Sequence, residues 1–292
     1  MIAGLVASVV ASVLFGAMYY LAPQLAPLDG EQIFGWRVLA TLPFTTVLLL
    51  ALGQGRRVRL LLLRVRRQPL LGLALLGSAA MLGAQLWLFL WAPLHGRALP
   101  VSLGYFLLPL AMVLAGRVLF HERLSRLQWL AALLAGAGVA HEVLRAGGVS
   151  WETWLVSLGY TVYFVMRRRL ATDHLGGHWL DMALLLPAAL WFVLRPPSGL
   201  DLVLGHAHLW AMVPLLGVVS AVALALYMAA SRLLPLALFG LLSYVEPVLL
   251  AMAALLLGES ITAAQWPTYG PIFAAVALLV LDGGLQLTKQ KR

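Results

Sequence analysis

The segments "PLAMVLAGRVLFHERLSRLQW", residues 109–129, and "PVLLAMAALLLGESITAAQW", residues 247–266, resemble each other and decide how the chain is interpreted. In both segments a glutamate precedes a Gln-Trp pair by six residues. A proline leads each segment, 13 residues before the glutamate in the first copy and 12 residues before it in the second. Apolar helices often resemble each other by chance. The argument for a repeat therefore depends mainly on the fixed spacing between the glutamate and the Gln-Trp pair. We interpret the two segments as copies of one structural unit.

The composition indicates a membrane protein. Of the 292 residues, 62% are hydrophobic and 11% are charged, whereas soluble globular proteins are about half apolar and about a quarter charged. This apolar excess cannot all be buried in one core, so lipid must be the solvent. The chain has no cysteine, which excludes disulfides and thiolate chemistry. No basic region precedes the first apolar run of about 20 residues, which we predict is a retained span rather than a signal peptide.

Ten stretches have the length and composition of transmembrane helices, because crossing a bilayer takes about 20 apolar residues in helical conformation. The connections between them leave no room for a soluble domain. The predicted spans are residues 2–22, 32–52, 69–91, 98–120, 126–144, 151–171, 177–194, 207–230, 235–257 and 262–285.

The distribution of lysine and arginine predicts the orientation of the spans. With the N-terminus inside, the inside loops and the C-terminal tail hold fifteen of the 20 basic residues and the outside loops hold three, while Arg37 and Arg117 lie within spans. Positive residues favour the cytoplasmic side, so both termini are predicted to be cytoplasmic. This bias also explains the net charge of +9. We expect the basic loops to contact anionic lipid headgroups rather than nucleic acid.

The two copies lie in spans four to five and nine to ten, so each half of the chain holds five spans. Because five is odd, the second half enters the membrane in the opposite orientation. We therefore predict an all-α membrane protein whose ten transmembrane helices form two inverted five-helix repeats, residues 1–146 and 147–292. Many secondary transporters have this architecture, because two similar halves can exchange conformations. The predicted function is movement of a small metabolite or an amphiphilic drug-like compound across the inner membrane.

Several short motifs resemble those of the RarD-type members of the EamA family, in the drug/metabolite transporter superfamily. They are "WRVLA" (36–40), "VSLGYFLLPL" (101–110), "ERLSRLQWLA" (122–131), "YVEPVLL" (244–250) and "LLLGES" (255–260). The resemblance covers nearly the whole chain and implies ten helices with a cavity lined mainly by spans one to four and six to nine. The chain departs from the family pattern at two positions. Leu108 stands where the family usually has a polar residue, and Glu246 stands where it usually has a neutral residue.

Polar side chains at helical spacing predict a substrate path. Ser78 and Gln85 are seven residues apart in span three, as are Ser220 and Tyr227 in span eight. The serines have an alternative role as hydrogen-bonding contacts between helices. Tyr105 is also predicted to bind substrate, because it lies in the Gly-Tyr-Phe motif that carries the family resemblance. The predicted substrate-binding residues are Tyr19, Arg37, Gln85, Tyr105, Tyr163, Tyr227, Ser243 and Glu246.

Glu246 and Arg37 are charged residues within predicted spans, and such residues usually serve function. Glu246, next to Ser243 on the helix face, has three interpretations: a proton- or cation-handling group, an ion pair with Arg37, or a protonated packing residue. Arg37 contacts substrate, reaches the interface, or pairs with Asp29 or Glu31.

Glu122 and Glu259 come at the start of spans five and ten. A carboxylate there favours the positive end of the helix dipole. We therefore expect each of the two to stabilise the helix that it begins.

The sequence offers no sign of an enzyme or of a cofactor. It lacks the Gly-x-x-x-x-Gly-Lys-Ser/Thr phosphate loop and the Gly-x-Ser-x-Gly nucleophile motif, and its histidines lack a complete zinc ligand set. We expect a small-molecule substrate, a coupling proton and membrane lipids as partners, no metal, and a monomer or a homodimer. The alternatives are an intramembrane enzyme acting on a lipid headgroup and a non-transporting membrane receptor.

The predicted orientation can be tested with topology reporters. Reporters fused after residue 292 and inserted within residues 56–67 should both read cytoplasmic, because both sites lie on the basic side. A reporter in the loop after Arg145 should read the opposite side. A periplasmic signal from either of the first two sites would remove the argument for inverted repeats.

Overall fold

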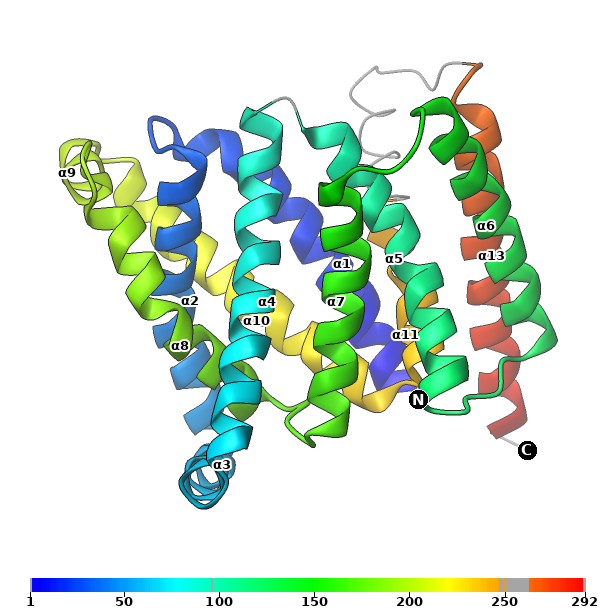
Figure 1. Cartoon of the computed structure of the whole chain (residues 1–292), viewed down its shortest axis with the longest axis horizontal. Coiled ribbons are helices and arrows are strands. Elements are labelled where there is room, and N and C mark those ends of the chain that lie inside the picture. The colour runs from blue at the N-terminus through cyan, green and yellow to red at the C-terminus, as the bar shows by residue number, and fades with distance from the viewer. Residues whose placement is uncertain (1, 96, 247–248, 250–262, 291–292) are drawn as a thin grey trace. The chain divides into compact units, whose positions relative to one another are not determined.

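The computed structural model describes all residues except 1, 96, 247–248, 250–262 and 291–292 (Figure 1). The described residues are mainly helical and include no strand. The helices in the predicted spans are α1 (Ile2–Leu21), α2 (Gly30–Ala51), α4 (Pro69–Leu94), α5 (Ala98–Leu119), α6 (Arg126–Arg145), α7 (Trp151–Arg169), α8 (Leu175–Leu194), α10 (Leu209–Leu233), α11 (Leu236–Leu242) and α13 (Trp266–Gln290). Three shorter helices are η1 (Ala22–Leu25), α3 (Gly55–Arg67) and α9 (Gly199–Gly205).

The helices that match the predicted spans agree with them to within a few residues, except in span nine. There α11 ends at Leu242, and most of the remaining predicted span lies outside the described residues. The basic segment at 55–67 is also a helix, α3, where the sequence suggested only a loop. Val58, Leu61 and Val65 recur at intervals of three and four residues, and arginines occupy most of the other positions outside the leucine run, which is the pattern of an amphipathic helix.

Among the residues that the structure describes, six helices are long and apolar enough to cross a membrane. They are α2, α4 over Pro69–Phe89, α5 over Pro100–Leu119, α6, α8 and α10. Two shorter apolar stretches, Ile2–Met18 and Trp266–Asp282, lie in α1 and α13. Large apolar side chains such as Leu70 and Leu144 are about four-fifths exposed, as a lipid-facing surface requires. The chain is a multi-pass membrane protein, and the arrangement of ten spans as inverted repeats stays a prediction.

The chain divides into two compact units, and each draws on both halves of the sequence. Unit 1 contains Met1–Gly16, Leu99–Thr161 and Ala230–Arg292. Unit 2 contains Ala17–Ala98 and Val162–Ala229. Consequently α1 and α7 each begin in unit 1 and end in unit 2.

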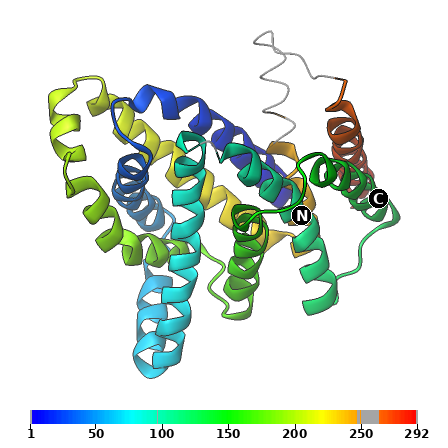
Figure 2. The same cartoon turned by 45° about the horizontal axis from the view of Figure 1, so that its top comes forward.

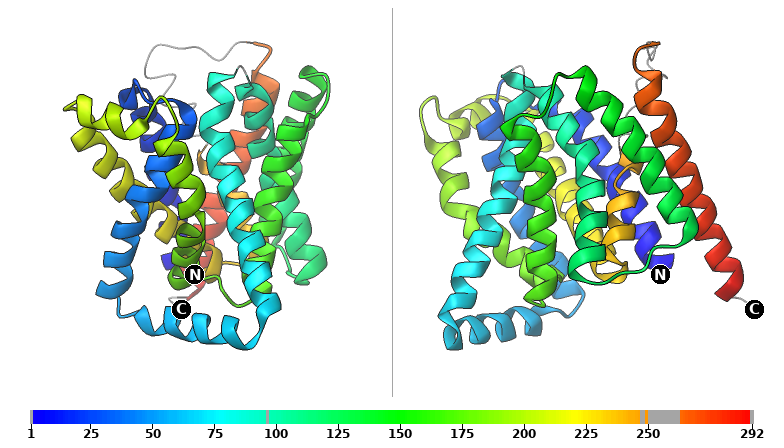
Figure 3. Two further views of the ribbon diagram at one scale, coloured as in Figure 1. Left: turned by 60° about the vertical axis from the view of Figure 1, so that its left-hand side comes forward. Right: turned by 45° about the vertical axis from the view of Figure 1, so that its right-hand side comes forward.

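In unit 1, α6 packs along the length of α13 (Figures 1 and 3). At one end, Gln128 Nε2 donates to Asp282 Oδ2 over 2.8 Å. Near the other end, Thr268 Oγ1 donates to Glu142 Oε2, also over 2.8 Å. Gln128 also forms a capping box with Ser125, which fixes where α6 begins. Polar bonds at both ends therefore set the register of this helix pair.

In unit 2, α2 packs along α8, as the turned view shows (Figure 2). Gln32 Nε2 donates to the carbonyl of Pro197 over 2.7 Å. Closer to the other end of the pair, Trp179 Nε1 donates to Thr46 Oγ1 over 2.7 Å. A capping box between Asp29 and Gln32 starts α2. Helix α4 packs against both members of the pair.

The crossing of α5 and α11 in unit 1 depends on a glycine. A Cβ at Gly240 would lie 2.5 Å from Met112 Cβ and 3.2 Å from the carbonyl oxygen of Pro109. Real Cβ atoms do not approach that closely, so the two helices can cross here only because residue 240 has no side chain.

Replacing Gly240 tests this crossing. Gly240→Ala should destabilise the purified protein by about 1–3 kcal/mol, because overpacking forces backbone shifts, and thermal unfolding in detergent would measure it. Gly136→Ala in α6 is the matched control, since its nearest neighbour would be Leu110 Cδ1 at 4.0 Å. The control should be neutral or slightly stabilising. Equal stability of the two variants would contradict the proposed contact.

Candidate functional site

The ninth predicted span is broken close to its charged residue. The amide of Ser243 donates to the carbonyl of Gly240, and the amide of Tyr244 to that of Leu241, which are i→i−3 bonds instead of helical i→i−4 bonds. Helical backbone resumes at Val245 and Glu246. The sequence suggested one continuous helix here, and that expectation was wrong. Discontinuous helices are typical of substrate sites in transporters, because they expose backbone groups within the membrane.

Side chains within the break hold it in place. Ser243 Oγ donates to the carbonyl of Phe239, whose oxygen lies one turn back. The buried Tyr244 donates its hydroxyl to the carbonyl of Phe106 in α5 over 2.8 Å. This anchor lies next to Tyr105, whose carbonyl gets no helical donor because residue 109 is a proline.

Three of the predicted site residues therefore lie in unit 1, in or near this break. Ser243 is in the turn itself and Glu246 is partly buried just after it. Tyr105 is half-buried, and its ring centroid lies 6.2 Å from that of Tyr160 in α7. Pro247 and Glu259 lie outside the described residues.

Unit 2 contains a fully buried ion pair that the sequence did not reveal. Arg167 in α7 and Asp181 in α8 both have completely buried side chains. Arg167 Nη1 lies 3.3 and 3.4 Å from the two carboxylate oxygens. Tyr163 donates its hydroxyl to Asp181 Oδ2 over 2.9 Å. The fifteen basic residues assigned to the inside loops and tail included Arg167, but the structure places it within α7 with its side chain buried. The signal that could have found the pair is the single aspartate within the apolar span at 177–194.

The guanidinium of Arg167 fits only because Gly177 lies beside it. A Cβ at Gly177 would be 2.2 Å from Arg167 Nη2. Within the described part of the chain, Arg167 Nε and Nη2 have no hydrogen-bond partner, and neither has Nε2 of the buried His178. A buried pair with such incomplete hydrogen bonding adds little to stability. Such a pair can instead contribute by fixing one specific arrangement of the two helices.

Arg37 is also buried in unit 2, with 5% of its surface exposed. Its Nε donates to Ser220 Oγ in α10 over 3.1 Å. Asp29 and Glu31 were the predicted ion-pair partners of Arg37. In the structure Arg195 forms ion pairs with both, at 3.4 Å from Asp29 and 3.0 Å from Glu31.

The remaining predicted residues of unit 2 lie on four helices. Phe164 stands between two of the predicted tyrosines, with its ring centroid 5.1 Å from Tyr163 and 5.5 Å from Tyr227. Gln85 is buried in α4. The side chain of Tyr19, near the end of α1, lies outside the described residues.

Glu122 stabilises a different helix from the one predicted. Its two carboxylate oxygens accept the backbone amides of Leu236 and Ala237 over 2.7 and 2.8 Å, at the start of α11. The first helix after it, α6, is capped by Ser125 instead. Glu122 thus joins the two halves of the sequence, because its loop follows α5 and its partners begin α11.

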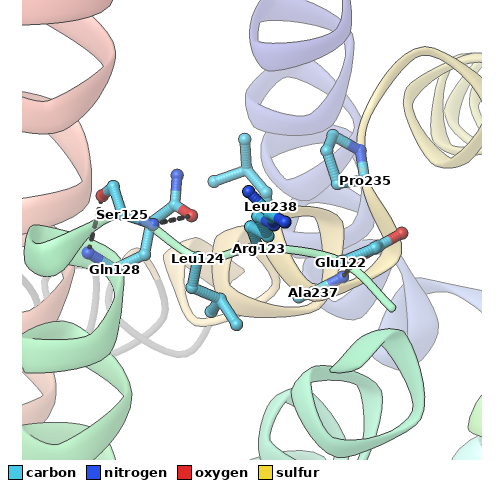
Figure 4. A pocket seen from close by; sticks show the side chains of 8 residues that line it. All are labelled: Glu122, Arg123, Leu124, Ser125, Gln128, Pro235, Ala237 and Leu238. Carbon is cyan, nitrogen blue, oxygen red and sulfur yellow. Dashed lines mark hydrogen bonds between the residues drawn. The ribbon is translucent and has the colours of Figure 1, made fainter. Parts of the chain in front are cut away.

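A small cavity of about 200 Å³ lies beside this contact (Figure 4). It is lined by Glu122, Arg123, Leu124, Ser125, Gln128, Pro235, Ala237 and Leu238. Ligand pockets for drug-sized molecules usually measure about 300–1,000 Å³. The carboxylate of Glu122 and the side chains of Ser125 and Gln128 are already held by protein partners. We therefore assign the substrate path elsewhere.

Curated proteins resemble this chain along nearly its full length. It is 43% identical over 290 residues to the chloramphenicol-sensitive protein RarD of Pseudomonas aeruginosa, covering 99% of this chain and 97% of that protein. It is 42% identical over 291 residues to an uncharacterized transporter of Pasteurella multocida, covering 99% of both. This chain belongs to the RarD family of transporters. The resemblance found in its motifs is thereby confirmed.

More distant relatives are also similar to this RarD-family chain. Protein RarD of Salmonella typhi is 29% identical over 276 residues, which is 94% of this chain and 90% of that protein. A solved crystal structure of a protein shares the fold, with a TM-score of 0.67 at 19% identity, over 95% of this chain and 98% of that one. No family model matches the chain. The transporter name of the Pasteurella multocida relative supports a transport function.

The buried ion pair of this RarD-family chain can be tested by replacing one or both partners. Asp181→Leu should destabilise the protein by about 3–5 kcal/mol, because it leaves the Arg167 charge buried without its counter-ion. Arg167→Met combined with Asp181→Leu should recover most of that loss. Thermal unfolding in detergent would measure both. A double variant no more stable than the single one would show that the two charges are not energetically coupled.

Proposed function

We propose that the chain is a secondary transporter that moves a small metabolite or amphiphilic compound across the inner membrane by alternating access. The observation that carries this proposal is the composition of the two compact units. Each unit is assembled from spans that occupy corresponding positions in the predicted repeats 1–146 and 147–292. Such an arrangement suits two conformations of similar energy, one open to each side.

Helices in equivalent positions of the two predicted repeats contact each other in pairs. Helices α2 and α8, the second spans of the two halves, pack together in unit 2, and the fifth spans, α6 and α13, pack together in unit 1. The fourth spans, α5 and α11, cross at Gly240.

The first spans of the two halves are also equivalent. Helices α1 and α7 pass from unit 1 into unit 2 after Gly16 and Thr161 respectively. We infer that these two helices transmit movement between the units during transport.

The predicted residues are kept as substrate contacts, each within the unit where it lies. In unit 1 these are Tyr105, Ser243 and Glu246, and Glu246 also serves as the coupling group because it is an ionisable residue next to a broken helix. In unit 2 they are Tyr19, Arg37, Gln85, Tyr163 and Tyr227.

Transport by the purified protein tests the function directly. Proteoliposomes that contain only this chain should move at least one compound of a panel of amphiphiles and metabolites. The name of the Pseudomonas aeruginosa relative makes chloramphenicol the first compound to include. Absence of protein-dependent flux for the whole panel, under inward and outward gradients, would contradict transport. Hydrolysis or modification of lipid headgroups would instead support an enzyme.

Glu246→Gln separates the interpretations of this glutamate, because glutamine keeps the shape but cannot ionise. If Glu246 handles the coupling proton, transport driven by a pH gradient should collapse while substrate exchange across the membrane persists. Both rates would be measured in proteoliposomes with the same protein content. Full pH dependence in the variant would eliminate the coupling role.

The ion-pair interpretation predicts a different pattern. In that case Glu246→Gln should reduce stability, and replacing Arg37 with glutamine in the same chain should restore it, because the buried charge is then removed. Arg37→Gln alone, with folding preserved and transport impaired, would favour a substrate contact.

A further inference from the structure

Helix α3 links two spans and must therefore lie at the membrane surface. It follows α2 after only Leu52–Gln54, and α4 begins one residue after it, at Pro69. Both neighbours are long and apolar enough to cross the bilayer. A 13-residue helix with such short connections has no freedom to leave the interface.

One face of α3 packs against other parts of unit 2, to which the helix belongs. Leu61 is buried and forms an apolar cluster with Leu71 and Leu75 of α4. Val65 packs against the same cluster. Arg64 Nη1 donates to the carbonyl of Leu170, in the turn between α7 and α8, over 2.8 Å. These contacts hold α3 across the ends of the helices, and Figure 3 shows it lying crosswise to α2 and α4.

The remaining surface of α3 combines positive charge with apolar side chains. The helix has six arginines and no acidic residue. Five of them besides Arg64 are exposed: Arg56, Arg57, Arg59, Arg66 and Arg67. Leu60, Leu62 and Leu63 are exposed between them, at 54%, 43% and 41%. We call this surface the basic face of α3.

We propose that the basic face of α3 binds anionic phospholipid, with its arginines on the headgroup phosphates and its exposed leucines among the upper acyl chains. Interfacial helices bind in this way, through apolar area and electrostatic attraction together. Each basic residue near an anionic surface strengthens the attraction. Arginine suits phosphate because its planar guanidinium donates two parallel hydrogen bonds. This proposal rests on the chain spanning a membrane and not on what it transports.

Nucleic acid fits this face less well. A polyanion would satisfy the arginines, but it would leave three large leucines exposed to water. The bilayer interface satisfies both kinds of side chain at the position where the chain connectivity already holds the helix.

A single-cysteine probe tests the proposal, since the chain has no native cysteine to label. Full-length protein carrying Leu63→Cys, labelled with an environment-sensitive fluorophore, would be titrated in neutral detergent with phosphatidylglycerol or with phosphatidylcholine. Phosphatidylglycerol should shift the emission to shorter wavelength, and phosphatidylcholine should not. Added salt should weaken the response, because screening reduces attraction between exposed charges.

The control probe is Leu204→Cys in α9. Leu204 is 60% exposed, but its helix has no basic residue and contains Asp201. Its label should respond alike to the two lipids. A preference for phosphatidylglycerol there equal to that at Leu63 would overturn the proposal.

A variant that lacks the exposed arginine charges of α3 provides a second test. Replacing the five exposed arginines with glutamine should weaken phosphatidylglycerol binding at least about a hundredfold. The helix itself should persist, because glutamine has a helix propensity similar to that of arginine. A C-terminal reporter checks that orientation is unchanged. An unchanged titration in a correctly oriented variant would contradict the proposal. So would tighter binding of a single-stranded oligonucleotide than of phosphatidylglycerol to the native protein.

Discussion

The bilayer imposes the constraint on which the rest of this structure depends. Hydrocarbon offers no hydrogen bonds, so every backbone and side-chain polar group within a span must find its partner inside the protein. The apolar surface needs no special packing, and large leucines such as Leu70 are left exposed. The few polar side chains therefore determine which helices pair and in which register, as Gln128 with Asp282 and Trp179 with Thr46 show.

Three places in the described part of the chain deviate from simple helix packing. The Ser243–Tyr244 turn interrupts the ninth span, Arg167 and Asp181 form an incompletely bonded buried pair, and Glu122 caps a helix from the other half of the chain. The buried pair carries a cost in a low-dielectric interior, because Arg167 Nε and Nη2 have no hydrogen-bond partner within the described residues.

The two compact units connect the fold to the proposed mechanism. Neither unit corresponds to one half of the sequence, because each combines spans from both. Counterpart helices such as α2 with α8 and α6 with α13 pack within one unit, whereas α1, α7 and the end of α10 continue from one unit into the other. Family membership supports a transporter function, and the proposed mechanism treats each unit as a part that moves as one. The anionic lipid surface proposed on α3 would act on unit 2, through Leu61 and Arg64.

The sequence by itself determined the solvent, the helical character, the approximate bounds of most spans and the family, because these follow from local composition, periodicity and short motifs. It also singled out Arg37 and Glu246 as charged residues within predicted spans. Only the tertiary structure decided which partners the charged residues have. Arg195 rather than Arg37 holds Asp29 and Glu31, Glu122 caps α11, and Arg167 is buried against Asp181. These pairings join residues up to 166 positions apart, and hydrophobic periodicity records which face of a helix is apolar but not which helix lies against it.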